Sequence, residues 1–402
     1  MGNQSERFIA KRVFEITNRL AETFPDQPSK ARFEQVAHIV AALFHYQFHA
    51  KEQAIISAWD NMASDPATAV SLASQLSDLL AAANYTTVTE DELVEAMENE
   101  SLIPLRLEVS LDDFDEVMIS RRASHTETIN VPVWKGLRNK QITITVYERV
   151  VIHTRVKPQS WFDERSVDPS DLNLLPGHAS LKQFQNVPRA DIEMLLPSTQ
   201  VRFRLIDTLM VGIPALASGV VVIATKLLPT LALLFVLAGA WISQSADPPE
   251  LDQTALAVLF GGTVTLGGFL FRQYNKLKNR KVQYLKTLSE NLYLRTLADG
   301  PGVFHTLLAS AEEQEVMETV VAYRLLLDSN GGQTSAELDA SVETWLLTQC
   351  GIEVDFEIDD AVAKLLSFNL ATRNGDKLIP IGLDDAVQHL NQKWDDIFVP
   401  TP

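Results

Sequence analysis

The sequence predicts an α+β membrane protein, with an N-terminal helical region, an antiparallel β domain, two or three transmembrane helices, and a C-terminal helical and winged-helix-like domain. Three observations predict this class: apolar residues at helical spacing near both ends, apolar residues alternating at period two between them, and three long uncharged runs. We expect five parts: an N-terminal helical region (1–100), an antiparallel β domain with a membrane-proximal collar (101–200), a transmembrane region (205–272), juxtamembrane helices (273–330) and an acidic winged-helix-like domain (331–402).

Helical spacing of apolar residues predicts the N-terminal region. Phe8, Val13 and Ile16 begin an apolar stripe that residues 31–62 continue, so we expect residues 1–84 to be mostly helical. The first apolar residues are mixed with charged ones, which argues against a signal peptide.

A change of period predicts the β domain. From Leu105 onward, polar and apolar residues alternate, which predicts an antiparallel sheet over residues 103–157. Five prolines follow between residues 158 and 200. They predict an irregular collar with one short helix near 190–196.

Three uncharged runs predict the transmembrane region. Residues 208–225, 227–246 and 253–271 form runs of 18, 20 and 19 residues without Asp, Glu, Lys or Arg. A helix of about 20 residues crosses a hydrocarbon core of roughly 30 Å. Lys and Arg are frequent from Arg272 to Lys286, so the positive-inside rule places the C-terminus in the cytoplasm. Basic residues also precede the first run, so two and three crossings both stay open.

The C-terminal part carries the signals of a winged-helix-like domain. Thr334 and Glu337 fit a capping box, a second helix is expected over 359–368, and Asn374-Gly375 predicts a hairpin turn. The whole chain has 34 Lys and Arg against 52 Asp and Glu, and from residue 335 onward there are 4 against 13, a net charge of −9. DNA binding needs the opposite sign, so we expect protein contacts and no nucleic-acid partner.

Three stretches resemble a known family. They are residues 181–197, residues 291–305 with their continuation into 311–315, and, more weakly, residues 147–150. The chain resembles a family of membrane proteins of unknown function that includes animal transmembrane protein 143 and its plant and cyanobacterial relatives. The family carries no established reaction, so the resemblance implies no catalytic residue. It marks a membrane-proximal motif made of Phe184, Pro188, Asp191, Glu193 and Pro197.

The resemblance and the N-terminus together predict a location. Eukaryotic members of this family look like organellar membrane proteins. This sequence begins without an Arg-rich, acid-poor transit peptide. We therefore expect a multi-pass protein of a bacterial plasma membrane or a thylakoid membrane, with its C-terminus in the cytoplasm.

Two groups of residues offer candidate metal-binding chemistry. His38, His45 and His49 are spaced seven and four residues apart, which on one helix places them near one face, where neutral imidazoles can bind a divalent metal. His305 and Glu312, also seven apart, share a helix face in the same way. The alternative for both groups is a solvated polar helix edge.

Recognisable catalytic motifs are missing from the sequence. It contains no His-Glu-x-x-His, no Gly-x-Ser-x-Gly, no P-loop and no Gly-x-Gly-x-x-Gly, and one cysteine, Cys350, excludes an internal disulfide. We predict no catalytic residue and no cofactor, and whether the protein is an enzyme stays open.

The expected function is that of a membrane-anchored scaffold or adaptor. A large part of the chain surrounds a small uncharged segment, which favours a protein that contacts the lipid bilayer and binds protein partners. The alternatives are a membrane-bound enzyme acting on lipid or a small molecule, and an oligomeric pore or transporter. Small residues four apart in the uncharged runs leave a homo-oligomer open.

Overall fold

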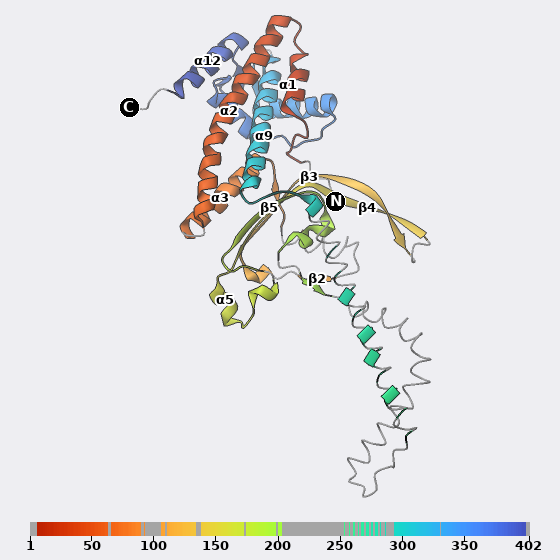
Figure 1. The fold of residues 1–402 in the computed structure, drawn as a ribbon. Coiled ribbons are helices and arrows are strands. Elements are labelled where there is room, and N and C mark those ends of the chain that lie inside the picture. The colour runs from red at the N-terminus through yellow and green to blue at the C-terminus, as the bar shows by residue number, and fades with distance from the viewer. Residues whose placement is uncertain are drawn as a thin grey trace. The chain divides into compact units, whose positions relative to one another are not determined.

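Figure 1 shows the computed structural model of the protein, which divides into two compact units. The first contains Met1–Glu100, Leu111–Ile192 and Arg295–Pro402, and the second contains Ser101–Ser110 and Glu193–Leu294. Apart from single positions between 253 and 286, the structure describes residues 6–62, 66–89, 92, 106–108, 111–133, 138–172, 174–197, 200–202, 293–329 and 331–398.

One long helix, α9 (Pro301–Leu327), forms the centre of the first unit. Its second half, from Val316 to Arg324, is buried without interruption. A helix that is buried all round must be enclosed by other elements. Those elements are α1 (Val13–Ala21), α2 (Gln27–Asn61), α3 (Pro66–Ala82), α10 (Ser335–Trp345) and α11 (Ile358–Ser367), all of which contact α9.

The helices predicted near the N-terminus are present. Helix α2 begins after Asp26, whose side chain accepts a hydrogen bond of 2.8 Å from the backbone N–H of Ser29. Its buried side chains, among them Phe33, Val40 and Phe44, recur at the helical spacing that the sequence showed. Figure 1 shows α2 running beside α9, and their side chains share one apolar core.

The predicted antiparallel sheet is also present, as five strands in the order β1-β3-β4-β5-β7. The long hairpin pairs Phe114 with Val156 at one end and Val133 with Arg138 at the other. All neighbouring strands in the sheet are antiparallel. The strands are β1 (Thr86–Thr87), β3 (Phe114–Val133), β4 (Arg138–Val156), β5 (Ala179–Pro188) and β7 (Thr296–Asp299).

The irregular collar expected over residues 158–200 needs correction. Its middle part forms β5, which pairs with β4 from Ala179 to Pro188. Leu181, Phe184 and Val187 are buried there, and their apolar contacts favour a strand although prolines surround it. The rest contains α5 (Gln159–Glu164) and short 3₁₀ helices at Pro169–Leu172 and Arg189–Leu195.

The C-terminal part has the order of elements of a winged helix, with α9 as its first helix. A short strand, α10, α11 and a hairpin follow α9. The predicted hairpin is present, but its two-residue turn is Gly375-Asp376, one residue later than the predicted Asn374-Gly375, because Asn374 pairs with Lys377. The predicted capping box is present, since Thr334 and Glu337 bond each other's backbone N–H groups. The strands pair in the order β8 (Gln333–Thr334), β10 (Lys377–Pro380), β9 (Ala371–Asn374), and α12 (Leu383–Asp396) follows them.

Gly332 allows β8 to reach β10. Its φ is +86°, in the left-handed region, and a Cβ there would lie 2.4 Å from Ile379 Cδ1 and 2.5 Å from the carbonyl oxygen of Leu378. Any side chain would therefore collide with β10, so the position requires glycine.

The membrane prediction is contradicted. Across the described stretches of the chain, no helix is both long and apolar enough for a bilayer crossing. The two longest, α2 and α9, carry charged side chains such as Lys51 and Glu318 within their length, and a hydrocarbon core strongly disfavours these. The multi-pass fold class and the bacterial plasma or thylakoid membrane location are therefore corrected. Residues 208–225, residues 227–246 and most of residues 253–271 lie outside the described residues.

The second unit contributes one small sheet to the described residues. Strand β2 (Arg106–Glu108) pairs with β6 (Gln200–Arg202) in antiparallel register, with Leu107 opposite Val201. This pairing joins the two separate chain segments that make up that unit.

A cavity in the apolar core around α9 should considerably lower the stability of the fold. Phe304 is fully buried and meets Trp59 edge-on, with ring centroids 5.6 Å apart. We predict that Phe304→Ala lowers the free energy of unfolding by about 3–5 kcal/mol, because it removes apolar contacts and leaves a cavity. Urea denaturation followed by circular dichroism measures this. Phe14→Ala, at a ring that is 67% exposed, serves as the control. Equal unfolding midpoints for the two variants would contradict the central place of α9.

Candidate functional site

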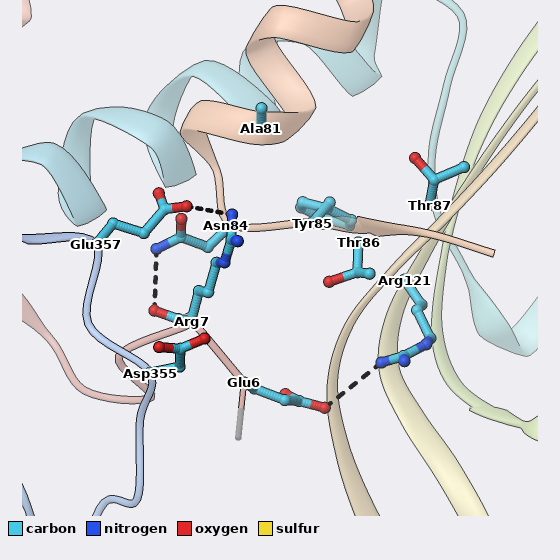
Figure 2. Close-up of a pocket in the computed structure, with 10 residues that line it drawn as sticks. All are labelled: Glu6, Arg7, Ala81, Asn84, Tyr85, Thr86, Thr87, Arg121, Asp355 and Glu357. Atoms are coloured by element: carbon cyan, nitrogen blue, oxygen red, sulfur yellow. Dashed lines mark hydrogen bonds and ion pairs between the residues drawn. The ribbon is translucent and has the colours of Figure 1, made fainter. Parts of the chain in front are cut away.

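A polar pocket of about 620 Å³ lies in the first unit, where the N-terminal segment meets the sheet and the chain before α11 (Figure 2). We use "N-terminal segment" for residues 6–12. The segment is held in place by backbone contacts, since Glu6 forms a parallel bridge with Val354 and its carbonyl oxygen accepts from the N–H of Asp355 at 3.1 Å. Charged and hydroxyl side chains dominate the lining, which includes Glu6, Arg7, Thr86, Arg121, Asp355 and Glu357.

Asn84 forms the wall between this pocket and a group of buried polar side chains. Its φ is +56°, a left-handed conformation that Asn tolerates better than most residues, and it is 7% exposed. Its amide Nδ2 lies 3.2 Å from the carbonyl oxygen of Arg7, 3.2 Å from Gln314 Oε1 and 3.0 Å from Glu318 Oε1. The amide thus connects the N-terminal segment with α9 in the core.

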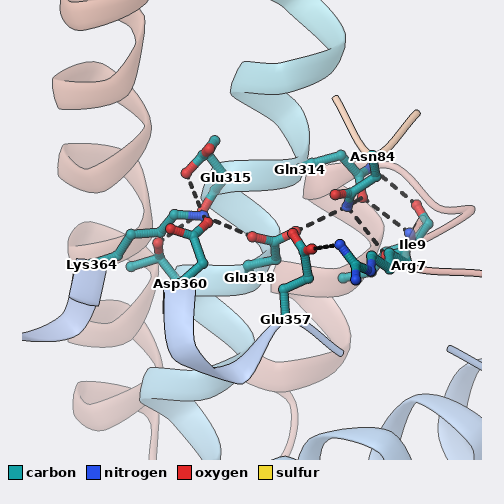
Figure 3. Close-up of polar contacts among 10 residues, drawn as sticks. Arg7, Ile9, Asn84, Gln314, Glu315, Glu318, Glu357, Asp360 and Lys364 are labelled. Atoms are coloured by element: carbon teal, nitrogen blue, oxygen red, sulfur yellow. Dashed lines mark hydrogen bonds and ion pairs between the residues drawn. The ribbon is translucent and has the colours of Figure 1, made fainter. Parts of the chain in front are cut away.

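The buried group centres on one lysine and three carboxylates, which we call the Lys364 cluster (Figure 3). Lys364 Nζ donates to Glu318 Oε2 at 2.7 Å, lies 2.6 Å from Asp360 Oδ2 and also forms an ion pair with Glu315. Glu315 and Glu318 are three residues apart on α9, and Asp360 and Lys364 are four apart on α11. These spacings place each pair on one helix face, so the cluster joins α9 to α11.

Burial dominates the electrostatics of the Lys364 cluster. It raises the pKa of Glu315 to about 7 against the opposing attraction of Lys364, and it raises the pKa of Glu318 in the same way. For Lys364, burial alone would lower the pKa, but the carboxylates of Glu318 and Glu315 outweigh it and raise the pKa above its usual value. The ammonium therefore stays charged, and Glu315 is partly protonated near neutral pH, because burial disfavours its charged form and one cation faces three acids.

The cluster contains donor atoms that could bind a metal. Oxygens of Glu315, Glu318 and Asp360 lie within 4.8 Å of one another, the convergence that a single cation needs. Lys364 Nζ is within ion-pair distance of all three and already supplies a positive charge. In this arrangement the Lys364 ammonium takes the place that a bound metal cation would occupy among the three carboxylates.

The histidines singled out in the sequence lie on the surface between α2 and α9. His45 Nδ1 is 3.1 Å from Glu312 Oε2, whereas His305 and His49 both approach Glu52. His305 and Glu312 therefore take part in two different contacts, and His38 is exposed. The sequence analysis did not identify Glu52 as a partner of these histidines, although it follows His49 by three residues on the same helix. Whether these candidate histidines bind a metal stays open.

The motif predicted to be membrane-proximal divides between two elements. Phe184 and Pro188 are buried in β5 and therefore serve the core of the sheet. Asp191 follows in a 3₁₀ helix, where burial raises its pKa although Arg295 Nη1 lies 3.9 Å away. Pro197 is exposed, and the side chain of Glu193 is outside the described residues.

Comparison with known proteins gives one finding on family. Residues 147–302 match the model of a family described as a protein of unknown function, DUF3754. The match runs from β4 through β5 and ends at the start of α9, so it includes much of the sheet that supports the site. Membership in the transmembrane protein 143 family stays a prediction. No solved structure matches the chain.

The raised pKa of Glu315 should make stability depend on pH. The pKa of Glu315 is about 7 in the folded protein, against 4.5 as its ordinary value, so the folded state binds the proton more tightly. The stabilising contribution is complete below about pH 4.5 and is lost as the pH rises through 7, with a slope of up to about 1.4 kcal/mol per pH unit. We predict that Glu315→Gln flattens this slope, measured by urea denaturation from about pH 5 to about pH 8.

Glu164→Gln, at an exposed acid at the end of α5, is the control and should keep the slope of the unchanged protein. If the free energy of unfolding has the same pH slope in the unchanged protein and in Glu315→Gln, the raised pKa of Glu315 is refuted.

Removing the ammonium should be more damaging than removing an exposed lysine. Lys364→Met leaves Glu315 and Glu318 buried without a cation, so we predict a loss of about 3–5 kcal/mol in the free energy of unfolding near pH 8. Adding Glu315→Gln and Glu318→Gln should restore most of that loss. Lys377→Met, on the exposed side of β10, is the matched control. The denaturation midpoints of Lys364→Met, the triple variant and Lys377→Met measure these effects. If Lys364→Met is as stable as Lys377→Met, the Lys364 cluster does not stabilise the packing of α9 against α11.

Proposed function

We propose that this protein is an adaptor that binds a basic protein partner through the acidic outer surface of its C-terminal module. The module comprises α10, α11, the β9–β10 hairpin and α12. The observation that carries the proposal is the orientation of charge on α11. Its one basic residue, Lys364, is 8% exposed and points into the core, where Asp360 pairs with it, while Asp359 is exposed.

The same orientation argues against a nucleic-acid partner. In helix-turn-helix proteins the second helix of the pair enters the DNA groove, and basic side chains contact the phosphates. Here the corresponding helix, α11, presents the carboxylate of Asp359 outward and keeps its one basic side chain in the core. A surface of this sign repels phosphates and attracts Lys and Arg side chains.

A partly exposed aromatic cluster at the end of α12 offers an anchor for the partner. Phe398 is 64% exposed, and its ring centroid lies 5.7 Å from that of Trp394 and 6.0 Å from that of Tyr46 on α2. Asp395 and Asp396 beside it are exposed. Aromatic side chains are enriched at the centres of protein interfaces, and their faces also attract guanidinium and ammonium groups. We call these five residues the docking face.

The other expected functions receive less support. An enzyme using His305 and Glu312 would need both at one centre, but each contacts a different residue of α2 at the surface. The hypothesis of a pore or transporter required the predicted membrane crossings, and we do not propose it. The adaptor proposal uses only contacts within the first unit.

Charge reversal on the docking face tests the adaptor proposal. We predict that the Asp395→Lys/Asp396→Lys variant and Phe398→Ala each weaken partner capture about tenfold, the usual effect of losing a central interface residue. The experiment is cross-linking in cells that produce the protein, with quantitative comparison of the proteins captured by each variant. Asp163→Lys/Glu164→Lys reverses two adjacent exposed acids on α5 and serves as the matched control.

A supporting result is a Lys- and Arg-rich protein captured by the unchanged chain and the control and lost from both docking-face variants. The proposal fails if all variants capture the same proteins in the same amounts.

A further inference from the structure

The polar pocket contains a half-buried guanidinium, that of Arg121, which forms no hydrogen bond with the described residues. The Arg121 side chain is 14% exposed, and no described residue accepts a hydrogen bond from it, its buried Nε included. The nearest acids, Glu6 and Glu92, lie 3.7 and 3.9 Å from its nitrogens, beyond the roughly 3.2 Å of an N–H···O bond. Leaving the buried Nε–H without an acceptor is costly. An oxyanion from outside the described chain would satisfy this donor.

The surroundings of Arg121 suit a carboxylate. The guanidinium carbon lies 5.1 Å from the centre of the Tyr147 ring, which fixes its orientation. Thr86 is its direct partner on the neighbouring strand β1, and both side chains line the pocket. A planar guanidinium and a hydroxyl that line the same pocket can hold a carboxylate by several hydrogen bonds.

The rest of the pocket calls for a positive charge in the same ligand. Arg7 is paired with Glu357, and Glu6 accepts a hydrogen bond of 2.7 Å from Ser124. Asp355 is exposed and forms no ion pair within the described part of the chain, and Figure 2 shows it on the other side of the pocket from Arg121. The three acids exceed the two arginines by one negative charge, which disfavours a ligand with several negative charges.

We propose that this pocket binds a small zwitterion, a free amino acid or a short peptide, with its carboxylate at Arg121 and Thr86 and its ammonium at Asp355. The volume of about 620 Å³ falls in the range of pockets that enclose small molecules. Two opposite charges at opposite ends select a zwitterion over a simple anion, because each lone charge satisfies one end only. The site is separate from the docking face, so the proposal is independent of the adaptor function.

Isothermal titration calorimetry on the full chain tests the proposal with a graded set of probes. Glycine, γ-aminobutyrate, ε-aminocaproate, diglycine and triglycine carry both charges at increasing separation. The α-amino acids with larger side chains test the remaining volume. Acetate, succinate and ethylamine carry one kind of charge only. We expect at least one zwitterion to bind, acetate and ethylamine to bind at least about tenfold more weakly, and the preferred length to separate a free amino acid from a peptide.

Variants locate the binding in the pocket. Arg121→Gln and Asp355→Asn should each weaken the bound zwitterion by at least about tenfold, while Arg373→Gln and Asp376→Asn, on the exposed β9–β10 hairpin, should not change it. Because Arg121 is half-buried, Thr86→Val and Asp355→Asn at exposed positions keep the test valid if Arg121→Gln fails to fold. The proposal is overturned if no zwitterion binds, if acetate binds as tightly, or if the folded pocket variants bind like the unchanged protein.

Discussion

A single buried ammonium compensates the charges that the central helix carries into the core. Helix α9 is enclosed by helices on all sides over its second half, yet it contains Glu315 and Glu318 on a face that meets α11. Carboxylates in such a place are tolerated only with a cation, with hydrogen bonds or in the protonated form. Lys364 and Asn84 provide the first two, and the raised pKa of Glu315 provides the third. The packing of α11, the N-terminal segment and the end of α3 all follow from this arrangement.

Because Lys364 pairs with carboxylates in the core, its positive charge is not available at the surface of this acidic chain. The lysine of α11 is used in the core, so the outer surface of the C-terminal module keeps its acids. A winged-helix order of elements is thereby combined with a surface that suits basic protein partners. Asn84 links the Lys364 cluster to the polar pocket through the carbonyl of Arg7, so occupancy of the pocket and the packing of the core share one residue.

Local signals predicted those elements that are defined by neighbours in the sequence. The helices up to Ala82, the β3–β4 hairpin, α9, the capping box at Thr334 and the β9–β10 hairpin, whose turn lies one residue later than predicted, all rest on spacing within a few residues. Strand β5 was missed because prolines suggested an irregular chain, while its pairing with β4 depends on distant residues. Helix α12 was not anticipated, although its buried Ala386, Val387 and Leu390 have helical spacing.

The site was harder to predict because it combines distant parts of the chain. Asn84, Glu318 and Lys364 lie far apart in sequence and meet only after α3, α9 and α11 have packed. The one local hint was Asp360 four residues before Lys364. The membrane prediction depended on uncharged runs alone, whereas the long helices that the structure describes, α2 and α9, carry charged side chains within their length.

The most direct measurement of the central claim is a site-resolved NMR titration of the Glu315 and Glu318 carboxyl groups together with the Lys364 ammonium. The account predicts that Glu315 titrates near pH 7, that Glu318 titrates above its ordinary range, and that Lys364 stays charged throughout. Two glutamates that titrate near 4.5, the ordinary value for this side chain, would contradict it.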